Sequence, residues 1–298
     1  MGPGSIEDVC EVELVARGSR SAESSPGLLI EVPHGATRGV HFEQTRRRLV
    51  GEYADDLKQF FHANTDVGSI EVARHVARMV SRDTDVLVVR GLIPRTFVDC
   101  NRVLEDGPTG EVREGITPGL PDYVRRPEDV LTLTRMYEQY QTVVREAYEM
   151  VCGRGGSALI LHTYAPRSVE IDRVDEGIVA ALRRAYEPEV YDGWVQRPEV
   201  DLISEDADGN RLAPRSLVQR LCAAYAATGI EVGENQTYRL VPSTMGYVHS
   251  KSYPEKVTCV EISRALLVEE FLPFEEMRID DVKALRMAAP IAKALRVD

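Results

Sequence analysis

The chain has 298 residues, of which 36 are Lys or Arg and 48 are Asp or Glu, so its formal net charge is −12. Nucleic-acid backbones and anionic membranes select for basic surfaces, and this acidic balance argues against either as the main partner. Because 43% of the residues are hydrophobic, we expect a folded protein with one large α/β domain or two smaller ones.

Targeting and cysteine patterns predict a cytoplasmic protein. No apolar run approaches the roughly 20 residues of a membrane-spanning helix, and no signal-peptide pattern follows the amino terminus. Residues 1–5, MGPGS, resemble a remnant of recombinant expression, and we assign residues 6–298 to a single domain. The five cysteines are widely spaced and include no C-x-x-C pair. We therefore expect reduced packing residues rather than disulfides or a thiolate zinc site.

Hydrophobic periodicity predicts alternating strands and helices. In chain order they are an edge strand over 6–16, a strand over 27–33, helices over 40–62 and 70–80 (the latter capped by Ser69), a strand over 87–97, a helix over 131–152, a strand over 155–163, a helix over 217–227, strands over 229–233 and 256–264, and a helix over 280–297. This alternation predicts a single three-layer αβα domain around a mostly parallel or mixed central sheet.

Four segments between these elements are predicted as loops. They are a serine-rich loop over 18–26, a Gly- and Pro-rich segment over 105–128 that is long enough for a lid, an acidic excursion over 168–211, and a Gly- and Tyr-bearing loop over 245–253. The chain shows no repeat, Gly-rich phosphate loop or G-x-S-x-G elbow, which argues against nucleotide binding and serine-hydrolase chemistry.

Polar residues gather at the end of the strand over 87–97. Arg95 lies within this run, and Asp99, Asn101 and Arg102 follow it. Arg offers a planar fork to a carboxylate, Asn adds a neutral donor, and Asp can hold Arg in place. This cluster therefore suits recognition of an anionic small molecule. The alternative is a solvated surface salt bridge, which is common for neighbouring Asp and Arg residues.

Two histidines and a carboxylate lie in, or directly after, other apolar strands. His34 follows the strand over 27–33, and His162 lies at the end of the strand over 155–163. Glu261 is embedded in an apolar strand, where an unpaired carboxylate costs several kcal/mol unless it has a metal, a cation or a catalytic task. Asp66 is either a turn residue or a carboxylate brought into the site. Two histidines and a carboxylate form a ligand set for catalytic zinc. Alternatively, the histidines satisfy backbone groups and do not converge.

Short motifs resemble, in order, those of the N-formylglutamate amidohydrolase family, which belongs with the zinc carboxypeptidase and aspartoacylase fold. Over residues 28 to about 270, they are VPHG at 32–35, TD at 65–66, VDCNR at 98–102, LILH at 159–162, Asn235, MGY at 245–247 and VEISRAL at 260–266. The resemblance implies that this chain has the zinc carboxypeptidase and aspartoacylase fold and that it is a metal-dependent hydrolase.

The resemblance implies that His34 and His162 bind Zn²⁺ together with an acidic ligand. Aspartoacylases and carboxypeptidases take this ligand three residues after the first histidine, where this chain has Thr37. Asp66 matches the Thr-Asp motif of the family and is our choice for the third ligand, with Glu43 as the alternative.

The same resemblance implies the remaining roles. Glu261 matches the general base, and Arg95 is expected to polarise the carbonyl of the scissile amide. Asn101 and Arg102 match the pair that holds the substrate carboxylate. The predicted substrate-binding set is Asn101, Arg102, Asp99, Asn235, Tyr247 and Arg264.

We therefore predict a zinc-dependent hydrolase that cleaves an amide bond next to a free carboxylate, in an N-acyl or N-formyl amino acid or a carboxyl-terminal peptide. The chain departs from the family at Gln141, where the family has His, at Met245 in place of a glycine, and before His162, where an Asp is absent. These departures leave the acyl group open.

Two other functions remain as alternatives. One is a carboxypeptidase acting on a peptide or protein tail, which the Gly- and Pro-rich and acidic segments would suit. The other is a carboxylate-binding protein without catalysis that has lost its metal, which the altered motifs support and the retained Glu261 opposes. Metal content distinguishes the enzyme from the binding protein.

Overall fold

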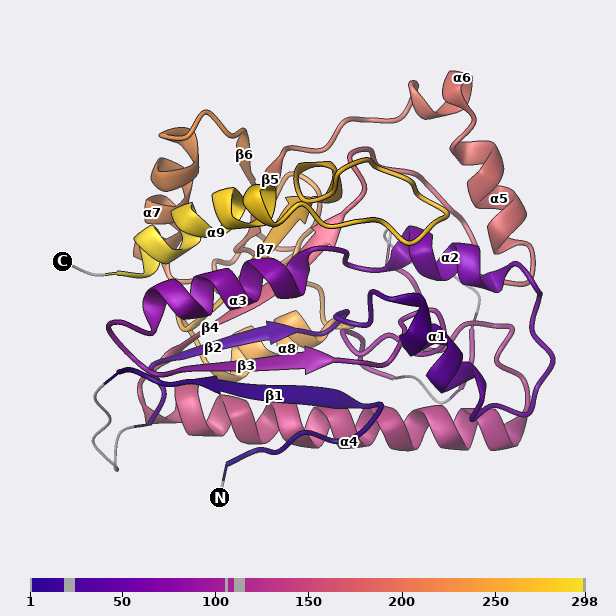
Figure 1. Cartoon of the computed structure of the whole chain (residues 1–298), viewed down its shortest axis with the longest axis horizontal. Helices are drawn as coiled ribbons and strands as arrows, with labels where there is room; N and C mark the ends of the chain where they lie inside the picture. Colours follow the sequence, from indigo (N-terminus) through magenta and orange to yellow (C-terminus); the bar gives the residue numbers. More distant parts are fainter. Residues whose placement is uncertain (1, 19–24, 105–106, 110–115, 297–298) are drawn as a thin grey trace.

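One sheet organises the chain in the computed structural model, which describes residues 2–18, 25–104, 107–109 and 116–296. Within them, seven strands pair in the order β1-β3-β2-β4-β7-β5-β6 (Figure 1). The strands are β1 (Cys10–Val15), β2 (Leu28–Val32), β3 (Val86–Gly91), β4 (Ser157–Tyr164), β5 (Val200–Ile203), β6 (Val232–Glu234) and β7 (Val257–Ser263). The helices are α1 (Gly39–Arg46), α2 (Leu57–Asn64), α3 (Ser69–Val80), α4 (Pro127–Val151), α5 (Ile178–Ala185), α6 (Pro188–Tyr191), α7 (Arg215–Ala226), α8 (Met245–Ser252) and α9 (Asp281–Leu295), with 3-10 turns at Cys152–Arg154 and Arg264–Leu266.

The centre of the sheet is parallel and its edges are mixed. Strands β3, β2, β4 and β7 run parallel to one another, whereas β1 is antiparallel to β3 and β5 is antiparallel to β7. Parallel strands are covered on both faces, which explains the continuous apolar runs that predicted them. The mixed α/β fold class expected from the sequence is confirmed.

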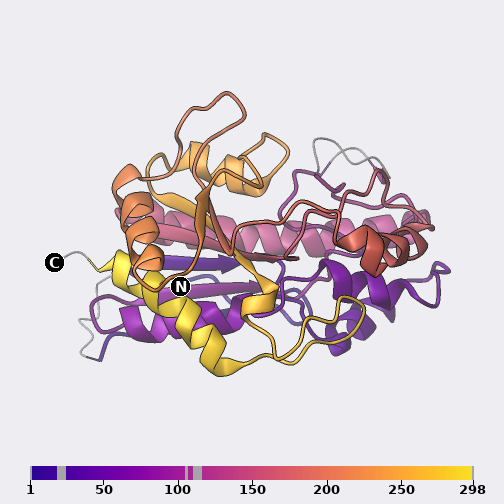
Figure 2. The ribbon, with the colours of Figure 1, turned by 90° about the horizontal axis from the view of Figure 1, so that it is seen from above.

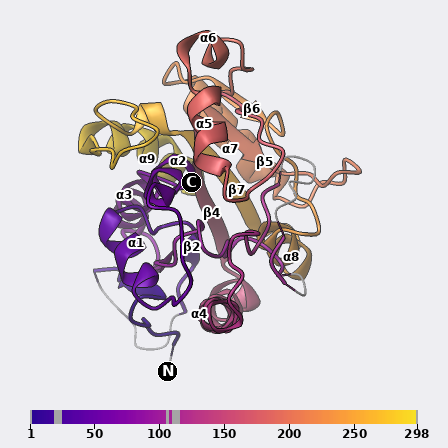
Figure 3. The ribbon, with the colours of Figure 1, turned by 90° about the vertical axis from the view of Figure 1, so that its right-hand side faces the viewer.

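Helices cover both faces of this sheet (Figures 2 and 3). On one face, α3, α7 and α9 pack over alternate strand residues such as Ile30 and Val88. On the other face, α4 lies over the intervening residues, such as Leu29 and Val89. Successive strand side chains point to opposite faces, so each central strand contributes to both cores. The carboxyl ends of β2 and β3 point to the same end of the molecule, on the right in Figure 1.

The prediction of one helix over residues 40–62 is wrong, because the structure has two helices, α1 and α2, with irregular chain between them. Asp129 of α4 accepts hydrogen bonds from the backbone N–H groups of Val50 and Gly51 and from the hydroxyl of Tyr53. The connecting residues therefore bond to α4 instead of continuing a helical turn.

Two predicted loops contain regular structure. The excursion over 168–211 holds α5, α6 and the short strand β5, and the loop over 245–253 is the helix α8. Thr244 caps α8, because its hydroxyl accepts the N–H of Tyr247. Elements this short span too few residues to show a period of their own, so the sequence pattern could not identify them. The run over 87–97 is strand only as far as Gly91, and Gly68, not Ser69, occupies the N-cap of α3.

Parts of the predicted segments lie outside the described residues. They are Met1, residues 19–24 of the serine-rich loop, 105–106 and 110–115 of the predicted lid, and 297–298 at the end of the last helix. The five cysteines are free, and four of them are buried, as expected of packing residues. In the described part of the chain, no helix is both long and apolar enough to cross a membrane.

Candidate active site

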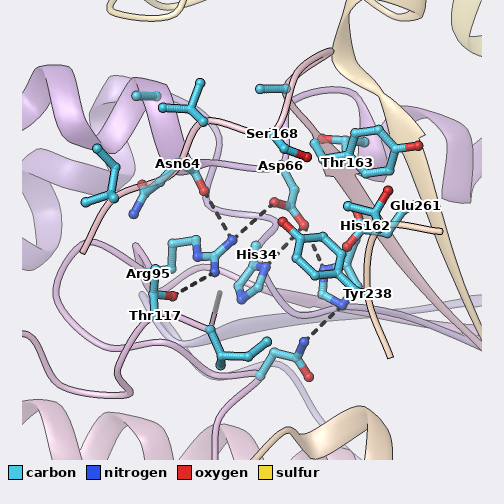
Figure 4. A pocket seen from close by; sticks show the side chains of 18 of the residues that line it. His34, Asn64, Asp66, Arg95, Thr117, His162, Thr163, Ser168, Tyr238 and Glu261 are labelled. Atoms are coloured by element: carbon cyan, nitrogen blue, oxygen red, sulfur yellow. Dashed lines mark hydrogen bonds and ion pairs between the residues drawn. The ribbon is translucent and has the colours of Figure 1, made fainter. Parts of the chain in front are cut away.

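A cavity of about 660 Å³ is lined by the residues that follow or end the parallel strands (Figure 4). His34 follows β2, Arg95 follows β3, His162 lies in β4 and Glu261 lies in β7, while Asp66 lies between α2 and α3. Parallel strands present their carboxyl ends at one edge of a sheet, which is where α/β proteins bind ligands. The topology therefore brings the predicted metal-binding and catalytic residues to one cavity.

His34, Asp66 and His162 form the centre of the site. Asp66 Oδ2 lies 3.1 Å from Nδ1 of His34 and 2.8 Å from Nδ1 of His162, and the centroids of the two rings are 5.0 Å apart. This convergence excludes the hypothesis that the histidines do not meet. Burial acts to raise the pKa of Asp66, but the two histidines, His34 above all, hold that pKa below its ordinary value.

Each histidine is also held through its other ring nitrogen. His34 Nε2 lies 2.6 Å from Oδ1 of Asp99, and the side-chain amide nitrogen of Asn101 lies 3.2 Å from His162 Nε2. Burial and Arg95 act to lower the pKa of His34, but Asp99 and Asp66 outweigh them and raise it. These contacts fix the orientation of both rings, and a carboxylate on the second ring nitrogen, as at His34, is a common partner of metal-binding histidines.

Asp99 lies behind His34 instead of facing the cavity. Its side chain is 1% exposed, and it accepts hydrogen bonds from His34, from Nη2 of Arg95 at 2.8 Å and from the backbone N–H of Asn101 at 2.9 Å. Asp99 is not among the described residues that line the cavity, and its contacts connect His34 to Arg95 and to the backbone of Asn101.

Glu261 is a buried carboxyl beside His162. It is the register partner of His162 across β4 and β7, so both side chains leave the sheet on the same face. Its side chain is 8% exposed, and its Oε2 has no hydrogen-bond partner among the described residues. Burial raises the pKa of the Glu261 carboxyl to about 7. A base with this proton affinity suits proton transfer near neutral pH.

Two of the predicted arginines are already engaged by carboxylates. Arg95 Nη2 donates to Asp99 and also lies 3.3 Å from the hydroxyl of Thr117. Arg102 Nη2 lies 3.5 Å from the same carboxylate, and its Nε and Nη1 donate to the carbonyl oxygens of Thr117 and Asn101. Figure 4 shows Asp66 between Arg95 on one side and His162 on the other.

Arg264 differs from these arginines. It lines the cavity and is 5% exposed, and its Nη1 donates to the carbonyl oxygen of Ala63 at 2.6 Å. Among the described residues, its Nε has no hydrogen-bond partner, and no carboxylate lies within 4.0 Å of its guanidinium. Burial lowers the pKa of Arg264. A buried cation without a carboxylate is therefore available to a ligand.

Three predicted residues lie apart from this constellation. Asn235 and Tyr247 are not among the described residues that line the cavity. The side-chain oxygen of Asn235 accepts the backbone N–H of Ser204, which gives this residue a place in the scaffold. Glu43, the alternative third ligand, pairs with Lys58 at the surface, whereas Asp66 joins the histidines.

Arg197 and Tyr238 line the cavity although no sequence feature singled them out. Arg197 donates from Nη2 to the Tyr238 hydroxyl at 2.9 Å, and its guanidinium lies over the rings of Tyr164 and Tyr238. Tyr238 and His162 line the same cavity. Arg197 and Tyr238 lie outside the motifs and the regular elements, so their pairing carried no local signal.

The donor set fits a catalytic metal ion. One ligand atom from each of His34, Asp66 and His162 lies within 4.8 Å of the other two, and all three side chains are buried. Two imidazole nitrogens and one carboxylate oxygen are three protein ligands of the kind that leave a fourth position free in catalytic zinc sites. The carboxylate of Asp99 behind His34 is the outer partner expected of such a ligand.

Comparison with known proteins places the chain in a family. The sequence pattern of the N-formylglutamate amidohydrolase family matches residues 27–268. The N-formylglutamate amidohydrolase of Ralstonia eutropha JMP134 has a similar structure, with a TM-score of 0.54 and 16% identity, over 94% of this chain and 96% of that one. A gene product of Agrobacterium tumefaciens is similar with a TM-score of 0.56 and 16% identity, over 96% of this chain and 94% of that one. No match was found among curated proteins.

The family match covers most of the sequence, and it includes every strand of the sheet except β1. The two solved structures independently show the same fold. The chain therefore belongs to the N-formylglutamate amidohydrolase family and is a hydrolase that acts on amide bonds.

Proposed function

We propose that this protein is a zinc-dependent hydrolase that cleaves an amide bond next to a free carboxylate. The observation that carries the proposal is the convergence of His34, Asp66 and His162 within 4.8 Å, beside the buried carboxyl of Glu261. The substrates of such an enzyme are N-acyl or N-formyl amino acids and the carboxyl-terminal residues of peptides. Water adds to the carbonyl carbon, the C–N bond breaks, and a carboxylate and an amine leave.

His34, Asp66 and His162 would hold the zinc ion. When bound, zinc supplies a Lewis acid that polarises the amide carbonyl and makes water easier to deprotonate. Asp99 and Asn101 hold the two rings in a fixed orientation, so the ligands do not have to be ordered when the ion binds.

Glu261 acts as the general base. Its carboxylate lines the cavity and accepts the proton of the attacking water. It then returns the proton to the amine nitrogen as the C–N bond breaks. Arg95, which Asp99 holds in place, directs fixed positive charge to the oxygen that becomes negative.

Arginines of the cavity recognise the carboxylate of the substrate. Arg264 is buried without a carboxylate partner, and Asn101 and Arg102 line the same cavity. An anionic ligand offsets the cost of burying a guanidinium, and charge-assisted hydrogen bonds hold it strongly. An anionic substrate is therefore compatible with a chain whose net charge is −12.

Metal content and turnover, measured together, test this proposal. The wild-type protein is expected to hold about one zinc per chain and to release free amino acids from a panel of N-formyl and N-acyl amino acids and short peptides. His162→Ala should lose zinc and activity. Glu261→Gln should keep zinc but lose activity by roughly 10²-fold to 10⁴-fold. His75→Ala, which alters a histidine paired with Asp281 away from the cavity, serves as the control and should keep both.

The same measurements separate the alternatives. Turnover of peptides but not of acyl amino acids would identify a carboxypeptidase. A wild-type protein that neither holds metal nor turns over any member of the panel after zinc is added would instead support the carboxylate-binding alternative.

A further inference from the structure

We propose that the preferred substrate carries one carboxylate, held by Arg264, and a bulky apolar group beside the scissile amide. This inference rests on the proposed amide hydrolysis and narrows its substrate class. The apolar group is of phenyl or branched-alkyl size, and it belongs either to the acyl group or to the side chain of the amino acid.

One wall of the cavity is apolar. Phe60 and Ala63 of α2 line it together with Ile178 and Leu182 of α5, and Val174 lies between β4 and α5 in the chain. These residues belong to the same hydrophobic core, so the two helices give the cavity an apolar part of its wall. Polar substrate groups gain nothing from such a wall, whereas an apolar group loses its contact with water there.

The apolar wall adjoins the carboxylate anchor. Arg264 Nη1 donates to the backbone carbonyl of Ala63, one of the α2 residues that line the cavity. Because Arg264 also lines the cavity, a carboxylate bound by its guanidinium lies next to the surface formed by α2 and α5. A substrate that satisfies both features has its charge and its apolar group close together.

The charges of the cavity favour one carboxylate over two. Arg95 and Arg102 are each paired with Asp99, and Arg239 is paired with Glu205. A second substrate carboxylate would have to compete with these pairs. Arg264 differs from these three arginines, because no carboxylate of the described residues lies within 4.0 Å of its guanidinium.

The remaining cavity arginines are also engaged. Arg167 is paired with Asp192, and Arg197 is stacked on two tyrosine rings and hydrogen-bonded to Ser168 and Tyr238. Among the described arginines of the cavity, Arg264 is thus the buried one without a carboxylate.

The size of the cavity agrees with a larger substrate than a formyl amino acid. Its volume is about 660 Å³, which lies within the range of roughly 300–1,000 Å³ of pockets that enclose drug-sized ligands. A small acyl group next to a short polar side chain would leave the apolar wall without a contact.

A panel of four substrates with the same amide and α-carboxylate tests this inference. N-formylglycine provides the baseline, N-formylphenylalanine adds an apolar group on the amine side, N-benzoylglycine adds one on the acyl side, and N-formylglutamate adds a second carboxylate. We expect kcat/KM to be about tenfold or more higher for one of the two phenyl substrates than for the other three, since burial of an apolar group is worth this much in specificity. Which of the two is preferred identifies the side of the amide that faces the wall.

Variants of the wall link this preference to α2 and α5. Ala63→Leu fills the space at the wall and Leu182→Ala removes part of it, and each is expected to lower the ratio of kcat/KM for the preferred phenyl substrate to that for N-formylglycine by about tenfold. Ala223→Leu adds the same bulk on the exposed side of α7 and should leave the ratio unchanged. A cooperative thermal unfolding transition verifies that each variant is folded. Because Ala63→Leu enlarges a side chain and Leu182→Ala shortens one, either variant can test the wall if the other does not fold.

Arg264→Met tests the anchor. The wild-type enzyme should have a higher kcat/KM for the better phenyl substrate than for the analogue in which a carboxamide replaces the carboxylate. In the variant, the ratio of these two kcat/KM values should fall by about tenfold to hundredfold, because a hydrogen bond to a charged group contributes that much. Equal effects of the variant on the acid and on the amide would overturn the assignment of Arg264.

The possible failures are distinguishable. If no member of the panel is cleaved by the zinc-loaded wild-type protein, the proposed function itself fails. If N-formylglutamate or N-formylglycine is cleaved at least as well as both phenyl substrates, amide hydrolysis stands and the apolar substrate class is wrong.

Discussion

At the scale of single residues, buried carboxylates organise this protein. Asp99 joins His34 to Arg95 and to the backbone of Asn101. On the face of the sheet that α4 covers, Glu31 is 2% exposed and accepts the hydroxyls of Tyr140 and Tyr148. Only complete hydrogen bonding makes such burial tolerable. Removing one partner should therefore have a measurable cost.

The orientation of His34 by Asp99 predicts an effect on metal affinity. Asp99→Asn keeps the shape of the side chain but removes the charge that holds the imidazole, so zinc affinity should fall by roughly 10-fold to 100-fold. Competition with a chromogenic chelator measures this affinity. Asp122→Asn, at a carboxylate that pairs with Arg125 at the surface, is the control, and an affinity equal to that of the wild type would contradict the positioning role of Asp99.

The two tyrosines on Glu31 predict an effect on stability. Tyr148→Phe leaves Oε2 of Glu31 without the hydroxyl that lies 3.0 Å from it, and the free energy of unfolding should fall by about 1–3 kcal/mol. Urea denaturation measures the change. Tyr191→Phe removes a hydroxyl that has no hydrogen-bond partner, so it should have little effect. Equal losses in the two variants would show that the contact with Glu31 is unimportant.

At the scale of elements, contacts between distant segments decide where helices end. The break between α1 and α2 is held by Asp129 in the first turn of α4, which accepts two backbone N–H groups. The sequence between residues 40 and 62 shows an apolar period across this break, because apolar residues of both helices face the same core. A prediction from helical spacing alone therefore merges α1 and α2 into a single helix.

Loss of the Asp129 contacts should destabilise the connection between α1 and α2. Asp129→Ala leaves the N–H groups of Val50 and Gly51 and the hydroxyl of Tyr53 without their acceptor, and we expect a loss of roughly 2–4 kcal/mol from unsatisfied buried groups. Glu128→Ala removes an exposed carboxylate from the same helical turn and controls for helix effects. Chemical denaturation compares the two variants, and indistinguishable midpoints would contradict this account of the break.

At the scale of the whole molecule, the site joins segments that are held by one sheet. His34, Asp66 and His162 come from three separate parts of the chain, and Asp66 lies within hydrogen-bond distance of both histidines. A metal ion that binds these residues in the native state and not in the unfolded chain adds to the stability of the fold.

Zinc should therefore raise the thermal midpoint of chelator-treated protein. At a free zinc concentration about 100 times Kd, the stabilisation is about 2.7 kcal/mol, and differential scanning fluorimetry should show a shift of several degrees. His162→Ala should show no shift, while His75→Ala should retain it. A chelated wild-type protein that melts at the same temperature with and without zinc would argue against a metal at these three residues.

Much of the fold was predictable from local patterns. The central strands are continuous apolar runs because both of their faces are covered, and the long helix α4 shows its period over many turns. The short elements α5, α6, β5 and α8 were not predicted, since they span too few residues for a period. Of the site, the histidines and Glu261 were predictable because they stand in or directly after apolar strands, where a polar residue is conspicuous.

By itself, the sequence determined the class of fold and which chemically active residues follow the buried strands, because hydrophobic periodicity and motif order are local properties of the chain. Only the tertiary structure decided that Asp66 rather than Glu43 meets the histidines, that Asp99 lies behind His34, and that Arg264 faces the cavity without a carboxylate. These outcomes depend on which side chains from distant segments come within hydrogen-bond distance, and packing across the sheet sets those distances.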